Sequence, residues 1–186
     1  MEIMKAIRER RSIREYKPDP VSDEDLSEVL EAARWAPSWA NTQCWKFIIV
    51  KNPDTKKKLA GTLSPGNPAF SSFTGAPVII AACAQLGKAG YYKGTAGTDK
   101  GDWYMFDVAL AMQNLTLAAH AKGLGTVHVG FFDAKKAAQT LGVSEGTVVV
   151  EMTPLGYPAG TTKVTPRKEL NNFVFYEKFG VLAKSL

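Results

Sequence analysis

Two residue types that commonly bind metals or form disulfides are scarce, because the 186-residue chain has two cysteines and two histidines. Cys44 and Cys83 are too isolated to define a metal-ligand spacing. No acidic or cysteine side chain stands at ligand spacing from His120 or His128, so both are expected to be ordinary structural histidines. The sequence therefore predicts no metal site and, because it shows no export signal, no disulfide.

Long apolar stretches are also absent. The longest purely apolar run, over 76–84, is too short to span a bilayer. The first residues run straight into a charged amphipathic segment, unlike a secretory leader. We therefore expect a cytoplasmic protein that does not associate with membranes.

Catalytic motifs that work without a cofactor are missing as well. There is no convincing triad or carboxylate pair, and Ser38 lacks the context of a nucleophile elbow. Gly123-Leu124-Gly125 follows a helical pattern and precedes a strand, which is the reverse of a dinucleotide fingerprint, and the segment 94–100 lacks the spacing of a P-loop. If the protein is an enzyme, we expect a cofactor to carry the chemistry.

The composition is that of one globular domain, with 45% hydrophobic and 22% charged residues. The net charge of +5 favours anionic ligands weakly and does not by itself indicate nucleic acid. Helical and strand patterns are interleaved without strict alternation, and no repeat or linker interrupts them. This arrangement favours a single α+β or three-layer domain over a regular doubly wound sheet.

Hydrophobic periodicity and capping residues predict the individual elements. Helices are expected from the N-terminus to about Arg10, from Ser22 to Pro37, and over 54–63, 102–122 and 134–141; strands are expected over 47–50, 76–83, 126–129 and 147–152. The helix over 102–122 is apolar on nearly every side, which favours a central position, a subunit interface, or both. The glycine-rich segment 87–101 is expected to be the least structured, either a mobile lid or a surface loop.

Two polar segments stand out from this framework. Arg10-Arg11-Ser12-Ile13-Arg14 places three guanidiniums and a hydroxyl within five residues, at the end of the first predicted helix. A solvated basic face is the ordinary interpretation of such a run, but guanidiniums also suit phosphate and other oxyanions. The loop 37–45 is unusually rich in hydrogen-bonding and aromatic side chains.

Several segments, taken in order, resemble the nitroreductase family of flavin enzymes. They are Arg10-Arg11-Ser12-Ile13-Arg14, Pro37-Ser38-x-x-Asn41-x-Gln43-x-Trp45, Tyr104-x-x-Asp107 leading to Gln113-Asn114-Leu115, Gly123-Leu124-Gly125-Thr126 running to Gly130-Phe131-Phe132-Asp133, Pro154-Leu155-Gly156-Tyr157-Pro158, and Arg167-Lys168. Each motif alone is weak, but their order and spacing are specific and cover nearly the whole chain. The resemblance implies an α+β fold, a three-layer α-β-α sandwich with a mixed, mainly antiparallel sheet, in an intertwined homodimer. It also implies one domain over 1–186, whose tail from about 159 packs on the partner subunit.

The same resemblance implies non-covalent FMN at the dimer interface. FMN would take a hydride from NADH or NADPH and reduce a small acceptor, such as a nitroaromatic or a quinone, in a ping-pong cycle. Positions matching the family's FMN contacts are Arg10, Arg11, Ser12 and Arg14, then Pro37, Ser38, Trp39, Asn41 and Gln43 for the loop that reaches the partner's FMN, Asn67 for the pyrimidine edge, Gly130 and Phe131 beside the flavin N5, and Arg167 with Lys168 or Lys163 for the phosphate. No catalytic side chain and no metal is implied, because the cofactor carries the chemistry.

Three positions differ from the residues usual in the family. Cys44 replaces a proline, while Trp39 and Phe131 are bulkier than usual, and these changes bear on substrate range rather than on FMN binding. Two other interpretations stay open. The same fold serves reductive dehalogenases and oxidative dehydrogenases, and a non-enzymatic basic module could use the arginine cluster to bind polyanions, although no nucleic-acid motif is present.

Overall fold

A four-stranded sheet forms the centre of the computed structural model, which describes residues 1–160 and 162–182. The strands β1 (Trp45–Val50), β2 (Val78–Gln85), β6 (Thr147–Gly156) and β5 (Gly125–Thr126) lie in the order β1-β2-β6-β5, and every pair is antiparallel. A parallel bridge between Ser12 and Thr126 extends the sheet beyond β5. The sheet is therefore mixed and mainly antiparallel, as the sequence predicted.

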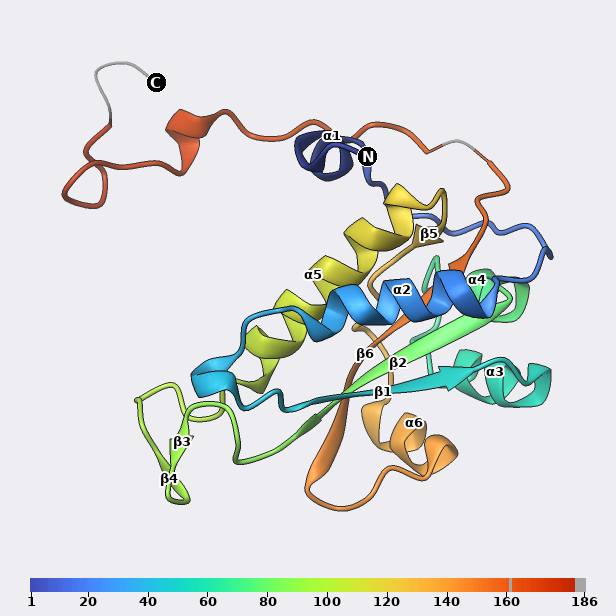
Figure 1. Cartoon of the computed structure of the whole chain (residues 1–186), viewed down its shortest axis with the longest axis horizontal. Coiled ribbons are helices and arrows are strands. Elements are labelled where there is room, and N and C mark those ends of the chain that lie inside the picture. The colour runs from blue at the N-terminus through green and yellow to red at the C-terminus, as the bar shows by residue number, and fades with distance from the viewer. Residues whose placement is uncertain (161, 183–186) are drawn as a thin grey trace.

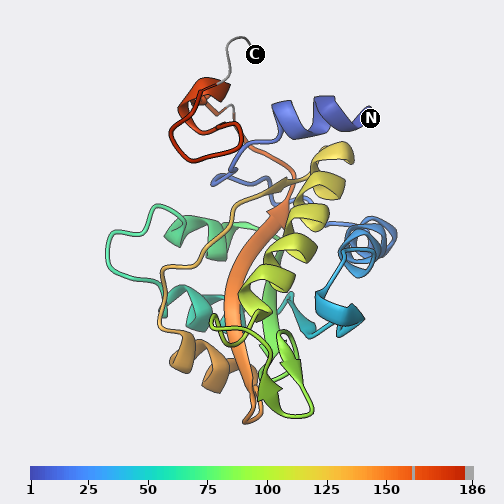
Figure 2. The ribbon, with the colours of Figure 1, turned by 90° about the vertical axis from the view of Figure 1, so that its left-hand side faces the viewer.

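Helices cover both faces of this sheet (Figures 1 and 2). On one face lie α2 (Asp23–Arg34) and α5 (Tyr104–Ala121), and on the other lie α3 (Pro53–Ala60), α4 (Phe70–Gly75) and α6 (Ala134–Leu141). Successive side chains of β2 point to opposite faces of the sheet, so each face has its own hydrophobic core. Ile80 packs with the α2–α5 layer and Ile79 with the α3–α4–α6 layer. The predicted three-layer sandwich is confirmed.

Local signals fix several helix ends where the sequence predicted them. The Ser22 hydroxyl accepts a hydrogen bond from the Asp25 amide at 3.0 Å and caps α2. At the end of α5, Gly123 has a φ of +77°, and the Leu124 amide donates to the Ala119 carbonyl at 2.9 Å. This is a Schellman ending, which needs the left-handed conformation that glycine adopts without strain.

Some boundaries differ from the prediction. The helix α2 ends at Arg34 rather than at Pro37, and α3 spans Pro53–Ala60 rather than 54–63. The strand β6 continues to Gly156, four residues beyond its predicted end, and α4 was not predicted. These elements rest on contacts with distant parts of the chain, which local propensity does not report.

The segment 87–101, expected to be the least structured, has a little regular structure. It contains a hairpin of β3 (Tyr91–Tyr92) and β4 (Thr95–Ala96). Lys93 and Gly94 both have positive φ, 48° and 81°, which is the geometry of a two-residue hairpin turn. The Gly97 amide donates to the Gly90 carbonyl at 2.7 Å and closes the base of the hairpin.

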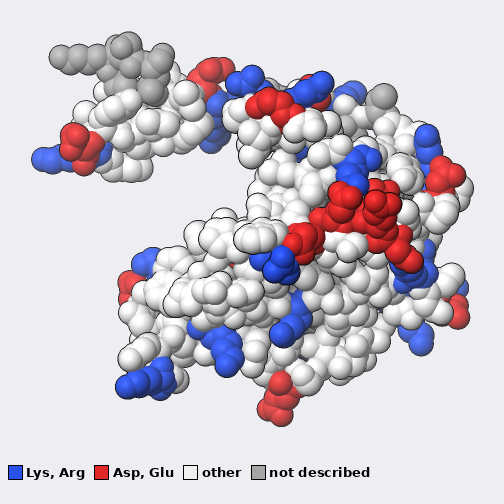
Figure 3. Space-filling view, viewed as in Figure 1, with Lys and Arg blue, Asp and Glu red and all other residues white. Residues whose placement is uncertain are grey.

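The N-terminal helix α1 (Ile3–Glu9) and the segment after β6 form an arm outside the sandwich (Figure 1). In the described part of this segment the regular structure is the short helix η2 (Leu170–Asn172). Most apolar side chains of the segment after β6 are exposed, and Phe179 is 92% exposed. Figure 3 shows a hollow between the arm and the body. No helix within residues 1–160 and 162–182 is long and apolar enough to cross a bilayer.

The two thiols are buried in the sandwich, which gives a direct test of the fold. Cys44 is 2% exposed and Cys83 is 1% exposed, and both are free. Burial, reinforced by the Asp107 carboxylate, raises the pKa of Cys44 to about 12, and burial raises the pKa of Cys83 to about 11. Because thiolates are the reactive form, Ellman's reagent at pH 8 should label neither thiol in native protein and both in urea. Rapid labelling before unfolding would contradict this packing.

Candidate functional site

The basic segment is held against the edge of the sheet. The Ile13 amide donates to the Thr126 carbonyl at 2.9 Å, next to the Ser12–Thr126 bridge. Gly125 permits this close approach, because a Cβ there would lie 2.6 Å from the Ile13 side chain. Gly125, which belongs to one of the quoted motifs, therefore allows the segment that carries the arginines to pack directly against β5.

The arm brings a second set of cations to the same place. An open cavity of about 330 Å³, here called the basic pocket, is lined by Arg10, Arg11, Ser12, Arg14, Thr162, Lys163, Thr165 and Arg167. Thus four of the predicted cofactor contacts meet Arg167, which is more than 150 positions away in the sequence. Lys163 lines this pocket, whereas Lys168 is exposed and is not part of the lining.

Arg10 is a half-buried member of the basic pocket. Its Nη1 atom is shielded from solvent and has no hydrogen-bond partner among residues 1–160 and 162–182. Burial, followed by the neighbouring Arg11 and Arg167 guanidiniums, lowers the pKa of Arg10. A half-buried guanidinium beside two other cations is the chemical complement of a multiply charged oxyanion. Arg11 has a partly structural role, since its Nη1 donates to the carbonyls of Arg8 at 2.6 Å and Arg10 at 2.7 Å.

The loop 37–43 lines a different cavity. This aromatic pocket, of about 360 Å³, is lined by Pro37, Ser38, Trp39, Trp103, Phe106, Asp107 and Leu110. The Trp39 and Trp103 ring centroids are 5.2 Å apart, and those of Trp103 and Phe106 are 5.5 Å apart. The pocket therefore offers apolar ring surfaces that suit a flat aromatic molecule. Trp103 was not singled out from the sequence, because nothing in its neighbourhood shows that it faces the loop.

Asp107 holds this loop in place. It is fully buried, and its carboxylate accepts hydrogen bonds from the Trp39 amide at 3.0 and 3.2 Å and from the Thr42 hydroxyl at 3.4 Å. The loop is strained, since Asn41 and Gln43 have φ values of 58° and 46°. Such conformations persist only where surrounding contacts enforce them. Asn41 and Gln43 are exposed and bond to each other, Nε2 to Oδ1, at 3.0 Å.

A third group of predicted contacts consists of Gly130 and Phe131, on the chain that follows β5, and Asn67, which is bonded to it. The Asn67 Nδ2 donates to the Phe131 carbonyl at 3.1 Å, and its Oδ1 accepts from the Ala69 amide at 2.9 Å. Asn67 thus ties its own loop to the predicted N5 segment, Gly130–Phe131. Both residues of that segment are solvent-exposed, and the Phe131 residue is 73% exposed. Within the described residues, no group of three or more potential metal ligands gathers here or elsewhere.

The basic and aromatic pockets lie at opposite ends of α5. Asp107, in the first turn, lines the aromatic pocket, while His120, near the last turn, shares a cavity with Arg10. Thirteen residues of helix separate the two, or about 20 Å at 1.5 Å per residue.

Enlarging Gly125 should displace the basic segment. In a Gly125→Ala variant the new methyl group overlaps Ile13, so we expect a loss of about 1–3 kcal/mol in the free energy of unfolding. Urea unfolding measures this loss. Gly75→Ala is the matched control, because a Cβ at Gly75 meets nothing within 4 Å and its φ is not positive. Equal stability of the two variants would contradict the packing of Ile13 on Gly125.

Comparisons with known proteins agree with this geometry. The family model described as the nitroreductase family matches residues 7–71 and 64–157. A protein of Archaeoglobus fulgidus, provisionally named NADH dehydrogenase/NAD(P)H nitroreductase, is 34% identical over 161 residues, covering 84% of this chain and 86% of its own. The FMN reductase [NAD(P)H] of Bacillus subtilis is 29% identical, with 89% and 70% covered.

Solved structures show the same relationship. The FMN-dependent nitroreductase of Clostridium difficile R20291 superposes with a TM-score of 0.79 at 25% identity, covering 95% of this chain and 99% of its own. The sequence relatives and the fold thus point the same way as the motifs and the two pockets. This chain belongs to the nitroreductase family.

Proposed function

We propose that this protein is an FMN-dependent NAD(P)H oxidoreductase that reduces a small flat acceptor, such as a quinone or nitroaromatic, by a ping-pong cycle. The observation that carries the proposal is the buried, unpartnered Nη1 of Arg10 in a pocket that also contains Arg11, Arg14 and Arg167. The names of the relatives supply the cofactor and the electron donor.

The residues of the basic pocket fit the FMN phosphate. A phosphate group is a dianion with several acceptor oxygens, and planar guanidiniums bind such groups in a bidentate manner. Arg10 and Arg167 would hold the phosphate, with Ser12 and Lys163 as additional donors. Lys168 does not line the pocket and would not contact the phosphate directly. When bound, FMN supplies the capacity to accept a hydride from NAD(P)H and to pass it on. The side chains described here bind and orient it.

We further propose a homodimer in which each FMN is shared. Asp107 in the aromatic pocket and His120, which shares a cavity with Arg10, are about 20 Å apart along α5, so in this proposal a second copy brings a loop 37–43 to each flavin ring. The exposed apolar side chains on α5 and on both parts of the arm provide the surface for such pairing. They are Ile3, Met4, Ile7, Met105, Phe106, Phe173, Phe179 and Leu182, each at least 45% exposed in the single chain.

The test of the cofactor proposal is a spectrum and a half-reaction. Purified protein, or apoprotein given FMN, should show oxidised flavin bands at about one FMN per chain. Anaerobic NADH or NADPH should bleach them, and addition of 1,4-benzoquinone should restore them. Parallel double-reciprocal plots with both substrates varied would support the ping-pong cycle. Protein that neither carries nor takes up FMN would overturn the proposal, and steeply salt-dependent DNA binding would then favour the polyanion module.

The shared site can be tested by mixing two defective variants. Arg10→Ala damages the basic pocket and Trp39→Ala damages the aromatic pocket, so each homodimer should lose activity. Random exchange of subunits makes half of the dimers mixed, and each mixed dimer has one intact site, which should restore about a quarter of the parent activity. Without recovery after confirmed exchange, the two pockets would have to serve separate ligands.

A further inference from the structure

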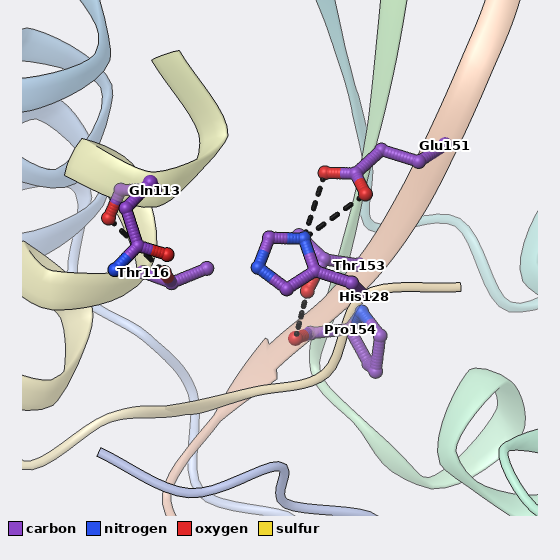
Figure 4. Close-up of polar contacts among 6 residues, drawn as sticks. All are labelled: Gln113, Thr116, His128, Glu151, Thr153 and Pro154. Carbon is purple, nitrogen blue, oxygen red and sulfur yellow. Dashed lines mark hydrogen bonds and ion pairs between the residues drawn. The ribbon is translucent and has the colours of Figure 1, made fainter. Parts of the chain in front are cut away.

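His128 and Glu151 form a hydrogen-bonded pair that none of the assignments above uses. The His128 Nδ1 lies 2.9 and 3.0 Å from the two Glu151 carboxylate oxygens (Figure 4). The side chains are 38% and 16% exposed, respectively. A carboxylate on one ring nitrogen fixes the orientation of an imidazole and places the proton of the other nitrogen in a defined direction. The sequence predicted an ordinary structural histidine here, but the side chain is accessible and oriented.

The backbone determines which way this pair faces. Val129 and Met152 exchange two amide-to-carbonyl hydrogen bonds of 3.0 Å, and both side chains lie in the core against α3, α4 and α6. Because neighbouring residues of a strand face opposite sides, His128 and Glu151 face the α5 side of the sheet. In Figure 4 the imidazole projects toward α5 at Gln113 and Thr116. Its Nε2 has no hydrogen-bond partner within the part of the chain that the structure describes.

The pair also lies on the path between the basic pocket and the exposed Gly130–Phe131 segment. Thr126 contacts the arginine segment through its bridge to Ser12. At about 3.3 Å per residue, His128 follows Thr126 by about 7 Å and Gly130 follows it by about 13 Å. An extended ligand with its phosphate at Arg10 and its ring along this segment therefore passes His128 before it reaches Gly130.

Reduction of a quinone needs a proton source close to the acceptor oxygen. The conversion of a quinone to a hydroquinone takes up two electrons and two protons, and a hydride delivers both electrons with one proton. The second proton must come from an acid within reach of the acceptor oxygen. Arginine and lysine side chains are poor acids near neutral pH, whereas imidazolium is well suited to this role.

We propose that His128 is the acid that protonates the acceptor and that Glu151 is its positioning residue. The Nε2–H bond of the imidazolium would break and an O–H bond would form on the acceptor, while bound FMN would supply the hydride. The imidazole is left neutral with its Nδ1–H bonded to Glu151, and it regains a proton from solvent through its exposed edge. The inference rests on the proposed function, because FMN and NAD(P)H supply the electrons.

The test compares acceptors that do and do not need a proton. In holoenzyme reduced with one equivalent of NADH, His128→Gln should slow reoxidation by 1,4-benzoquinone by about 100-fold, which lies within the range of general-acid contributions. Reoxidation by ferricyanide, which takes single electrons and no proton, should stay within about twofold of the parent rate, whereas loss of a merely structural residue would slow both. Lys51→Gln is the matched control, because it removes another exposed pair, with Asp23 at 2.7 Å, and Lys51 lines neither the basic nor the aromatic pocket.

Two further measurements distinguish an acid from a packing role. Imidazole added to His128→Ala should restore quinone reduction, and Glu151→Gln should slow it by about tenfold with ferricyanide unaffected. In apoprotein, the His128 imidazole NMR signal, identified by its loss in His128→Gln, should shift when one equivalent of FMN is added. The chain has only two histidines, so the assignment is direct.

The possible failures are separable. If the parent binds FMN and is reduced by NADH but His128→Gln reduces benzoquinone at the parent rate, the acid role of His128 is overturned and the proposed function stands. The acid role would also be overturned if His128→Gln slowed reoxidation by both acceptors equally, or if the His128 NMR signal did not shift when FMN is added. Parent protein that binds no FMN would overturn both.

Discussion

Replacing Arg10 with alanine is expected to raise the dissociation constant for FMN by about 100-fold. A hydrogen bond to a charged group contributes about 1.5–3 kcal/mol, and each 1.4 kcal/mol corresponds to a factor of ten in affinity. Arg10 should lie at the upper end of this range, because its Nη1 is shielded from water and without a protein partner in residues 1–160 and 162–182. The phosphate would be the first acceptor that this atom meets.

The measurement is a titration of apoprotein with FMN, followed by quenching of flavin fluorescence. Arg8→Ala is the matched control, since it removes the same charge from the last turn of α1, just before Arg10, and Arg8 does not line the basic pocket. Arg11→Ala should lie between the two, because part of its guanidinium caps the end of α1. If Arg10→Ala bound FMN as tightly as Arg8→Ala, the phosphate would have to lie outside the basic pocket.

The fold was largely predictable because its signals are local. Ser22 and Asp133 cap their helices through side-chain oxygens, and Gly123 ends α5 with a positive φ. The strand β2 is buried over residues 78–84, so its unbroken apolar run identified it despite the absence of alternation. Each of these features depends on the residue itself and its immediate neighbours.

The missed elements depend on distant contacts. The helix α4 has six residues and no side-chain cap, so no local signal marks it. Phe73 within it is fully buried in the core between the sheet and the α3–α4–α6 layer. The hairpin of β3 and β4 has strands of two residues and is held by Trp103, whose indole nitrogen donates to the Thr98 hydroxyl at 2.9 Å. Glycine content alone does not distinguish such a hairpin from an open loop.

The candidate site was predictable as a set of residues but not as an arrangement. Composition and motif order indicated Arg10 and Arg167, yet their meeting depends on the path of the arm after β6. The pairing of His128 with Glu151 depends on the register between the chain after β5 and β6, which no spacing in the sequence reports. Registers follow from which residues are buried on each face, a property of the assembled sheet.

Replacing Asp107 with alanine is expected to lower the free energy of unfolding by about 3–5 kcal/mol. The change leaves a cavity and removes the acceptor for the Trp39 amide and the Thr42 hydroxyl, and each unsatisfied buried donor costs about 1–3 kcal/mol. It also weakens the hold on the strained turn at Asn41 and Gln43, which then keeps only hydrogen bonds within the loop, such as that from the Gln43 amide to the Ser38 hydroxyl at 3.0 Å. The variant should therefore show both a lower free energy of unfolding and a changed conformation of the loop 37–43.

Urea unfolding measures the stability of Asp107→Ala, and the fluorescence of Trp39 and Trp103, whose rings are 5.2 Å apart, reports the loop in the native state. Asp107→Asn keeps one carbonyl oxygen for the Trp39 amide, so it should lose about 1–2 kcal/mol. Asp99→Ala, which breaks only the exposed pair with Lys100 at 3.0 Å, should be nearly neutral. If Asp107→Ala were as stable as Asp99→Ala with unchanged fluorescence, the loop would be held by its own turn. The aromatic pocket would then not depend on the first turn of α5, and α5 would no longer link the loop to the rest of the fold.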